Sequence, residues 1–161
     1  MFDLKWTCIL FVLLGVCCVN GECPETFERH GTQCYKVFSA RVSWLDAIRY
    51  CRLRGSQLLS IQSLTEQTVV NGILQRIRGA LESGSFWIGG GDMFNEGVFS
   101  WYYENGQFEP ISGYTNWESN QPDNRNDVEH CLGIDLNGRN GEWNDRDCNE
   151  QRYPICEARS N

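Results

Sequence analysis

Side-chain oxygen atoms are concentrated in the stretch QPDNRNDVEHC, which begins at Gln121. Gln121 and Asp123 flank a proline, and Glu129 follows eight residues after Gln121. A second acid–amide pair, Asn144 and Asp145, stands in the stretch EWND. Carboxylate and amide oxygens are the ligands that calcium prefers, and calcium accepts about six to eight of them in irregular geometry.

These five side chains predict a calcium site with three carboxylates and two amide oxygens. The backbone carbonyl of Asp145 would add a ligand, and open places in the shell could take water or two neighbouring sugar hydroxyls. Pro122 restricts the backbone between the first two ligands, and the bond before a proline is where a cis peptide costs least. Magnesium and zinc suit the set less well, because magnesium demands octahedral geometry and zinc favours histidine and cysteine. The alternative interpretation is two ordinary turns, since Asn, Asp and Pro are typical turn residues.

The first 21 residues are typical of a secretory signal peptide. Their apolar run, WTCILFVLLGVCCV, is shorter than the roughly 20 residues of a membrane span, and small or polar residues follow it. We expect cleavage before Glu22, with an uncleaved signal anchor as the alternative. The remaining residues, 22–161, are long enough for one secreted domain with its own core. No other stretch of the sequence could span a bilayer.

The chain is acidic, with a formal net charge of −7. This charge argues against nucleic acid and anionic membranes as partners. Because the domain would begin at Glu22, directly before Cys23, we expect no coiled-coil neck or collagen-like stalk. Any oligomer would therefore form through the domain surface.

Six of the nine cysteines remain after residue 21, and six thiols in a secreted domain predict three disulfides. The sequence alone leaves their connectivity open. A zinc site is the alternative, but the spacings contain no CxxC pair. His30 and His130 are the only histidines, and neither stands beside a candidate nucleophile. With the cysteines paired, we expect no catalytic triad and no enzyme.

Two helices are predicted in the first half of the domain. In SWLDAIRYCRLRG, Ser43 would cap a helix that Gly55 ends. In SLTEQTVVNGILQRIRG, Ser63 and Glu66 have the spacing of a capping box, and Gly79 would end the helix. Both segments have apolar residues three or four positions apart, which is typical of a helix with one buried face.

Short β-branched or aromatic runs separated by Gly, Asn and Pro predict strands. They are CYKVF, LLSIQ, FWIGG, FSWYY, HCLGIDL, GEWND and YPICE. Two helices combined with short, mostly antiparallel strands predict an α+β domain. The segment from about residue 94 to residue 144 is rich in loop-forming residues, and long loops in a disulfide-linked domain are usually functional.

Across essentially all of residues 22–161, the chain resembles the C-type lectin family, and it is similar to small secreted invertebrate lectins of the perlucin type. The resemblance rests on WIGG (87–90), NWESNQPD (116–123), EHC (129–131), WND (143–145) and ICE (155–157). It implies the long form of the C-type lectin-like fold, with two helices, short mostly antiparallel strands and a long calcium-binding loop region. It also implies three disulfides, Cys23–Cys34, Cys51–Cys156 and Cys131–Cys148.

The resemblance further implies calcium-dependent binding of carbohydrate. The residues that would hold both the calcium and the sugar are Gln121, Asp123, Glu129, Asn144 and Asp145. Mannose-type members have Glu and Asn where Gln121 and Asp123 stand, so the pattern implies glycans with terminal galactose-type sugars. We expect a role in innate recognition of microbial glycans. One alternative is a shell-matrix protein that binds calcium mineral, and another is a calcium-free protein binder, against which the intact ligand set argues.

Two features depart from the family pattern. Galactose-binding members usually carry an aromatic residue shortly after the motif, whereas NRNDV has none and Arg125 stands there. Asp92 and Glu96 match the ligands of an auxiliary calcium site, but Asn124 and His130 replace the acids that would complete it. Because fewer charged ligands lower calcium affinity, we expect the auxiliary site to stay unfilled, with Asp92 and Glu96 as solvated loop residues; an occupied auxiliary site is the alternative.

Overall fold

The computed structural model describes residues 22–136 and 141–160. The signal peptide predicted over residues 1–21 lies outside the described residues. Within the described part, no helix is both long enough and apolar enough to cross a membrane.

The first described helix, α2 (Trp44–Arg52), begins at Ser43, as the sequence predicts. The Ser43 hydroxyl accepts a hydrogen bond from the backbone N–H of Asp46 (3.3 Å), which satisfies one of the free donors at the helix start. Trp44 and Cys51 lie on its buried face. This face packs against the sheet, and the polar face stays in solvent.

The second helix, α3 (Leu64–Ile77), begins after Ser63, whose hydroxyl accepts from the N–H of Glu66 (3.2 Å). Of the two hydrogen bonds in the predicted capping box, only this one forms. The carboxylate of Glu66 instead accepts from the N–H of Gln62 (2.9 Å) and from the hydroxyl of Tyr35 (3.0 Å). Glu66 therefore ties the start of the helix to the strand that carries Tyr35.

The described residues contain nine strands. They are β1 (Glu28–His30), β2 (Gln33–Val37), β3 (Gln57–Leu58), β4 (Ser85–Gly91), β5 (Ser100–Tyr102), β6 (Phe108–Pro110), β7 (Glu129–Asp135), β8 (Trp143–Asp147) and β9 (Tyr153–Arg159). The pairs are antiparallel except for β4 with β9. The α+β fold with two helices and short, mostly antiparallel strands is confirmed. The run LLSIQ differs from its prediction, because only its first residue lies in a strand.

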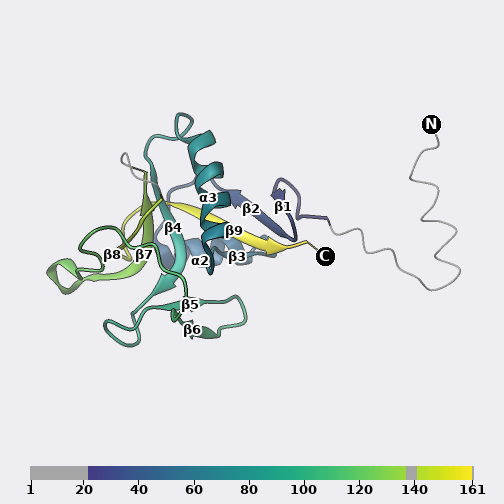
Figure 1. The fold of residues 1–161 in the computed structure, drawn as a ribbon. Helices are drawn as coiled ribbons and strands as arrows, with labels where there is room; N and C mark the ends of the chain where they lie inside the picture. The colour runs from purple at the N-terminus through teal and green to yellow at the C-terminus, as the bar shows by residue number, and fades with distance from the viewer. Residues whose placement is uncertain (1–21, 137–140, 161) are drawn as a thin grey trace, which may run out of the picture.

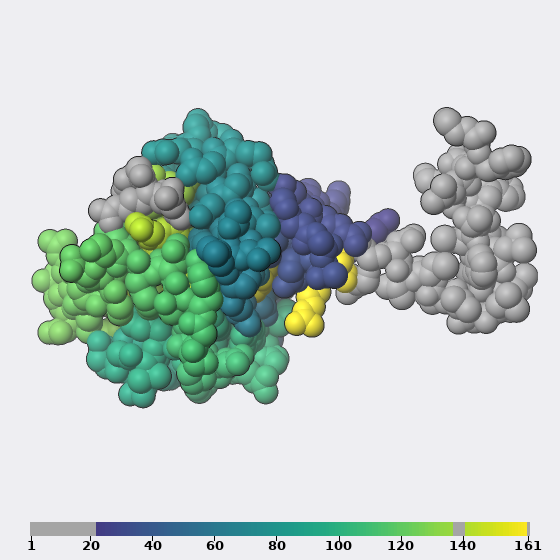
Figure 2. Space-filling model, viewed as in Figure 1, coloured from purple at the N-terminus to yellow at the C-terminus, as the bar shows by residue number. Residues whose placement is uncertain are grey.

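Strand β9 joins the two parts of the sheet. It pairs with β2 and β3, and also with β4, which continues to β5 and β7. Figure 1 shows β1 and β2 beside the end of β9, while β7 and β8 lie on the other side of the molecule. In the same view, the green loop segment that precedes β7 forms the outer surface at the left, far from the purple first strands (Figure 2). The oxygen-rich loop therefore lies away from the described ends of the chain.

Aromatic side chains make the base on which the loop region rests. Trp87, Trp101 and Trp143 are buried, and Trp117 is partly buried. The ring of Trp143 meets those of Trp101 and Trp117 edge to face, at centroid distances of 5.3 and 5.9 Å. Its indole N–H donates to the side-chain oxygen of Gln67 in α3 (2.8 Å). The backbone that continues into Asn144 is therefore anchored in the core.

Three disulfides link the described residues, and they are the pairs that the family resemblance implies. They are Cys23–Cys34, Cys51–Cys156 and Cys131–Cys148. The second bond joins α2 to β9. The third joins β7 to the residue directly after β8, so it links the two strands that carry Glu129 and Asn144.

Candidate metal centre

The QPD segment is an irregular loop held against β8. Its Gln121–Pro122 peptide bond is cis, and Asn124 has a left-handed backbone conformation. The backbone N–H groups of Asp123 and Asn124 both donate to the carboxylate of Asp145, at 3.2 and 2.7 Å. One predicted ligand therefore also anchors the loop that carries two others.

Glu129 begins strand β7 and is only 7% exposed. Its N–H donates to the side-chain oxygen of Asn124 (3.1 Å), and its carboxylate accepts from the N–H of Arg125 (3.2 Å). Burial raises the pKa of Glu129, and the Asp145 charge adds to this, against the hydrogen bond from Arg125 and the charge of Arg146. The carboxylate is thus fixed in position in surroundings that favour a compensating cation.

Three of the predicted ligands are brought together by the fold. One carboxylate oxygen from each of Asp123, Glu129 and Asp145 lies within 4.8 Å of the others. Asp145 is fully buried and Glu129 nearly so, whereas Asp123 is exposed. Negative charges this close repel one another, and a bound cation would remove that repulsion.

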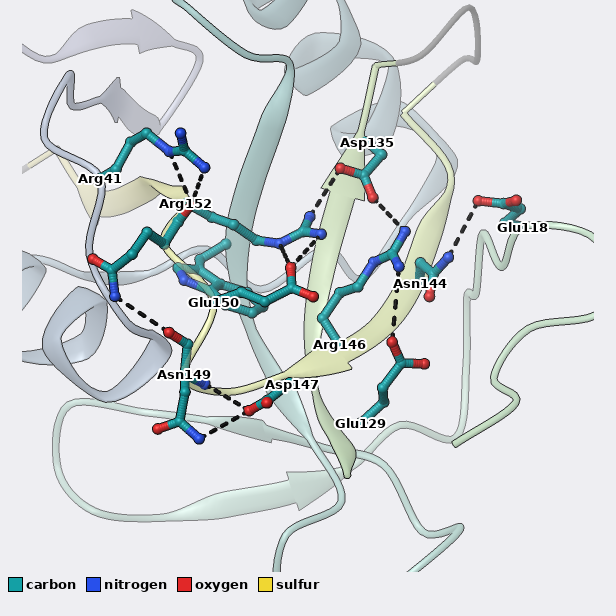
Figure 3. Close-up of polar contacts among 12 residues, drawn as sticks. Arg41, Glu118, Glu129, Asp135, Asn144, Arg146, Asp147, Asn149, Glu150 and Arg152 are labelled. Atoms are coloured by element: carbon teal, nitrogen blue, oxygen red, sulfur yellow. Dashed lines mark hydrogen bonds and ion pairs between the residues drawn. The ribbon is translucent and has the colours of Figure 1, made fainter. Parts of the chain in front are cut away.

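The two predicted amide ligands have unsatisfied oxygens. The side-chain oxygens of Gln121 and Asn144 are buried and have no hydrogen-bond partner among the described residues. The NH2 group of Asn144 donates to Glu118 (3.4 Å), so the orientation of that amide is set (Figure 3). A buried acceptor without a partner is costly, and coordination to a cation would satisfy it. Three carboxylates with two amide oxygens fit a hard divalent cation such as calcium.

A second cluster contains Asp92, Glu96 and His130, whose ligand atoms also lie within 4.8 Å of one another. The Nδ1 atom of His130 is 3.2 Å from a carboxylate oxygen of Asp92 and 3.3 Å from one of Glu96. The NH2 group of Asn124 donates to the other Glu96 oxygen (2.7 Å). The two residues that depart from the family pattern therefore hold the loop of residues 92–97 through polar contacts, Asn124 from the QPD segment and His130 from β7.

Two residues near the site were missed in the sequence. Glu118 binds the amide of Asn144, and Arg146 points its guanidinium toward Glu129 (Figure 3). Glu118 stands three residues before Gln121, so its closeness to the motif was a usable signal. Arg146 directly follows the WND motif, but no spacing shows on which side of β8 its side chain lies.

Comparison with known proteins decides the family. The sequence profile of the Lectin C-type domain matches residues 40–158. The chain belongs to the C-type lectin family. This C-type lectin is 33% identical to perlucin of Haliotis laevigata over 135 residues, which cover 84% of this chain and 82% of perlucin. It is 29% identical to the galactose-specific lectin nattectin of Thalassophryne nattereri over 137 residues, which cover 85% of this chain and 80% of nattectin.

A solved structure supports the same assignment. The crystal structure of the C-type lectin CEL-I from Cucumaria echinata matches with a TM-score of 0.74 at 31% sequence identity. The match covers 87% of this C-type lectin and 99% of CEL-I. Family and fold are those of carbohydrate-binding domains without catalysis. The comparisons do not favour the alternative of a mineral-matrix protein.

Proposed function

We propose that this C-type lectin is a secreted, calcium-dependent protein that binds glycans with terminal galactose-type sugars. The observation that carries the proposal is the pair of buried amide oxygens, on Gln121 and Asn144, that lack hydrogen-bond partners. In the sequence, Gln121 stands two residues before Asp123 and Asn144 directly before Asp145, and both of these acids belong to the cluster of three carboxylates. Calcium bound there would supply an electrophilic centre to which two neighbouring sugar hydroxyls can coordinate.

The protein's own side chains would orient the sugar. A carboxylate can accept a hydrogen bond from a sugar hydroxyl, and an amide NH2 can donate one. Gln121 and Asp123 place the donor before Pro122 and the acceptor after it, which is the reverse of the mannose-type order. The 29% identity to nattectin, a galactose-specific lectin by name, also supports a galactose-type ligand.

The segment after the motif offers no aromatic ring to the sugar. Arg125 is exposed and begins the short 3₁₀ helix Arg125–Asp127. Without a ring stacked on the apolar face of galactose, we expect only modest selectivity among sugars. In this proposal the ligands are microbial surface glycans met outside the cell, where disulfides persist.

Chromatography on galactose-agarose tests the proposal. We expect retention in calcium and release by EDTA. Asp123→Ala and Glu129→Ala each remove a charged ligand, and both should abolish retention. Glu104→Ala is the matched control, because it removes an exposed acid from the turn after β5 and should leave retention unchanged. Circular dichroism would verify that all three variants are folded. Retention of the parent protein that persists in EDTA would contradict the proposal.

A further inference from the structure

A chain of alternating charges leads from the partly exposed Glu150, through the buried Arg152 and Asp135, to the candidate centre (Figure 3). Its consecutive pairs are Glu150–Arg152 (2.8 Å), Arg152–Asp135 (2.9 Å), Asp135–Arg146 (2.7 Å) and Arg146–Glu129 (3.8 Å). Asp135 stands at the end of β7 and Arg146 within β8. Figure 3 shows the guanidinium of Arg146 between the carboxylates of Asp135 and Glu129. The last pair joins this network to a predicted calcium ligand.

Arg146 is held firmly from its interior side. Asp135 is buried and binds both Arg146 and the buried Arg152. Burial by itself would raise the pKa of Asp135, but Arg152, Ser85 and Arg146 together hold it below its ordinary value. Asp135 therefore remains ionised near neutral pH, and it keeps the Arg146 guanidinium in place when the other side of the network changes.

The contact between Arg146 and Glu129 is a contact of charges and not a hydrogen bond. At 3.8 Å, the two atoms are farther apart than hydrogen-bonded nitrogen and oxygen. Glu129 is positioned by the N–H of Arg125 and by its own N–H bond to Asn124. Arg146 therefore contributes positive charge to the centre, while backbone groups fix the geometry of the ligand.

We propose that Arg146 is a built-in positive charge that lowers the calcium affinity of the candidate centre and so sets the calcium concentration at which it fills. The inference rests on the proposed function. The charge on the ligands largely determines calcium affinity, and a fixed cation beside Glu129 offsets part of it. In a site open to water, a single and a double positive charge several ångströms apart repel by the equivalent of about a tenfold change in Kd.

Calorimetric titration of the secreted protein with calcium chloride tests this role. Arg146→Met keeps the apolar length of the side chain but removes its charge, and we expect its Kd for calcium to be about tenfold lower than that of the parent. Arg146→Gln is a second uncharged variant that can still donate to Asp135, and it should show the same change. Arg146→Lys keeps the charge and should bind calcium within about twofold of the parent.

A control separates a local charge from the net charge of the protein. Arg76→Met removes an exposed arginine of α3 that pairs with Glu28 of β1, and it should leave the Kd unchanged because Arg76 is far along the chain from the centre. If the parent binds calcium and both uncharged variants bind it with the same or a lower affinity, the inference on Arg146 is overturned and the proposed function stands. If neither the parent nor the uncharged variants bind calcium, the proposed function falls together with this inference. If the uncharged variants bind calcium and the parent does not, the result supports the inference that Arg146 lowers the calcium affinity.

Discussion

Asp145 has two tasks at the candidate centre. Its carboxylate stands in the acidic cluster, and its two oxygens also accept the backbone N–H groups of Asp123 and Asn124. Asp123, by contrast, is exposed and contributes its side chain to the cluster alone. Of these two acids in the predicted centre, only Asp145 therefore also anchors the loop by accepting its backbone hydrogen bonds.

This difference predicts unequal effects on stability for two equal changes of charge. Asp145→Asn places an amide where the loop needs two acceptors, so a partly buried N–H loses its partner, and we expect a loss of about 1–3 kcal/mol in the free energy of unfolding. Asp123→Asn should change that free energy by less than about 0.5 kcal/mol. Urea unfolding of both variants in EDTA measures the difference without calcium. Equal losses would show that Asp145 does not anchor the loop.

The residues proposed as ligands could be selected from the sequence, because oxygen-bearing side chains flank Pro122 and stand within the WND motif. The groups that hold these ligands were not. Asn124 and His130 stand out in the sequence only as departures from a pattern, whereas the fold uses them as polar contacts to Glu96. Such roles depend on which loops meet in space, and neighbouring residues in the chain carry no sign of it.

At the scale of elements, β9 is held to its neighbours by a buried acid. The carboxylate of Glu157 accepts from the side chain of Gln57 (2.9 Å) and from both the N–H (2.9 Å) and the hydroxyl (2.6 Å) of Ser60. Burial, working against these hydrogen bonds, raises the pKa of Glu157 to about 6. The acid therefore couples the packing of β3 and β9 to pH.

We predict that the contribution of Glu157 to the free energy of unfolding falls as the pH rises. Its pKa is higher in the folded chain than in the unfolded one, so the folded chain binds the proton more tightly, and this contribution is complete below the unfolded value. It is lost as the pH rises through about 6. Glu157→Gln has no such dependence, so between about pH 4.5 and 7 its stability relative to the parent should rise by roughly 2 kcal/mol.

Urea unfolding of both proteins across this pH range measures the Glu157 effect. Glu104→Gln, at an exposed position, is the control and should show a constant difference from the parent. A pH-independent difference for Glu157→Gln would mean that the buried acid titrates in the folded protein as it does in the unfolded chain.

The elements differ in how well local sequence predicts them. Both helix starts were found because the capping hydroxyls of Ser43 and Ser63 act on residues three positions away. The run LLSIQ was predicted as a strand, but the backbone of Leu59 and Ile61 is irregular although both side chains are buried. A run of apolar residues indicates that the side chains are buried. A β-strand also needs backbone hydrogen bonds to a partner strand, and only the tertiary fold supplies that partner. The short strands β1 and β6 were missed for the same reason.

At the scale of the whole molecule, the disulfides close loops of very different length. The Cys51–Cys156 bond spans a sequence separation of 105 residues, and the Cys131–Cys148 bond spans 17. A longer closed loop restricts the unfolded chain more, so the first bond should contribute more to the free energy of unfolding. Both cysteines of the long loop are fully buried.

Removing each bond by paired alanine substitutions tests this order. In the chain-entropy description, Cys51→Ala with Cys156→Ala should lower the free energy of unfolding by about 5 kcal/mol, and Cys131→Ala with Cys148→Ala by about 3 kcal/mol. Guanidinium unfolding at a low temperature, where the weakened variants stay folded, measures both. A larger loss for the short loop would show that local packing around β7 and β8 outweighs chain entropy.

The long disulfide also determines how mechanical load would pass through the molecule. Gln121, Glu129 and Asn144 all lie in the segment that the Cys51–Cys156 bond closes. If a glycan bound in the candidate centre were pulled, the force would be transmitted out of this segment along the covalent chain only through Cys51 or Cys156, and these two are bonded to each other. The force on a tether at either end of the domain would therefore pass through the same point, the disulfide between α2 and β9. The loops of the centre would bear the same load whichever end is anchored.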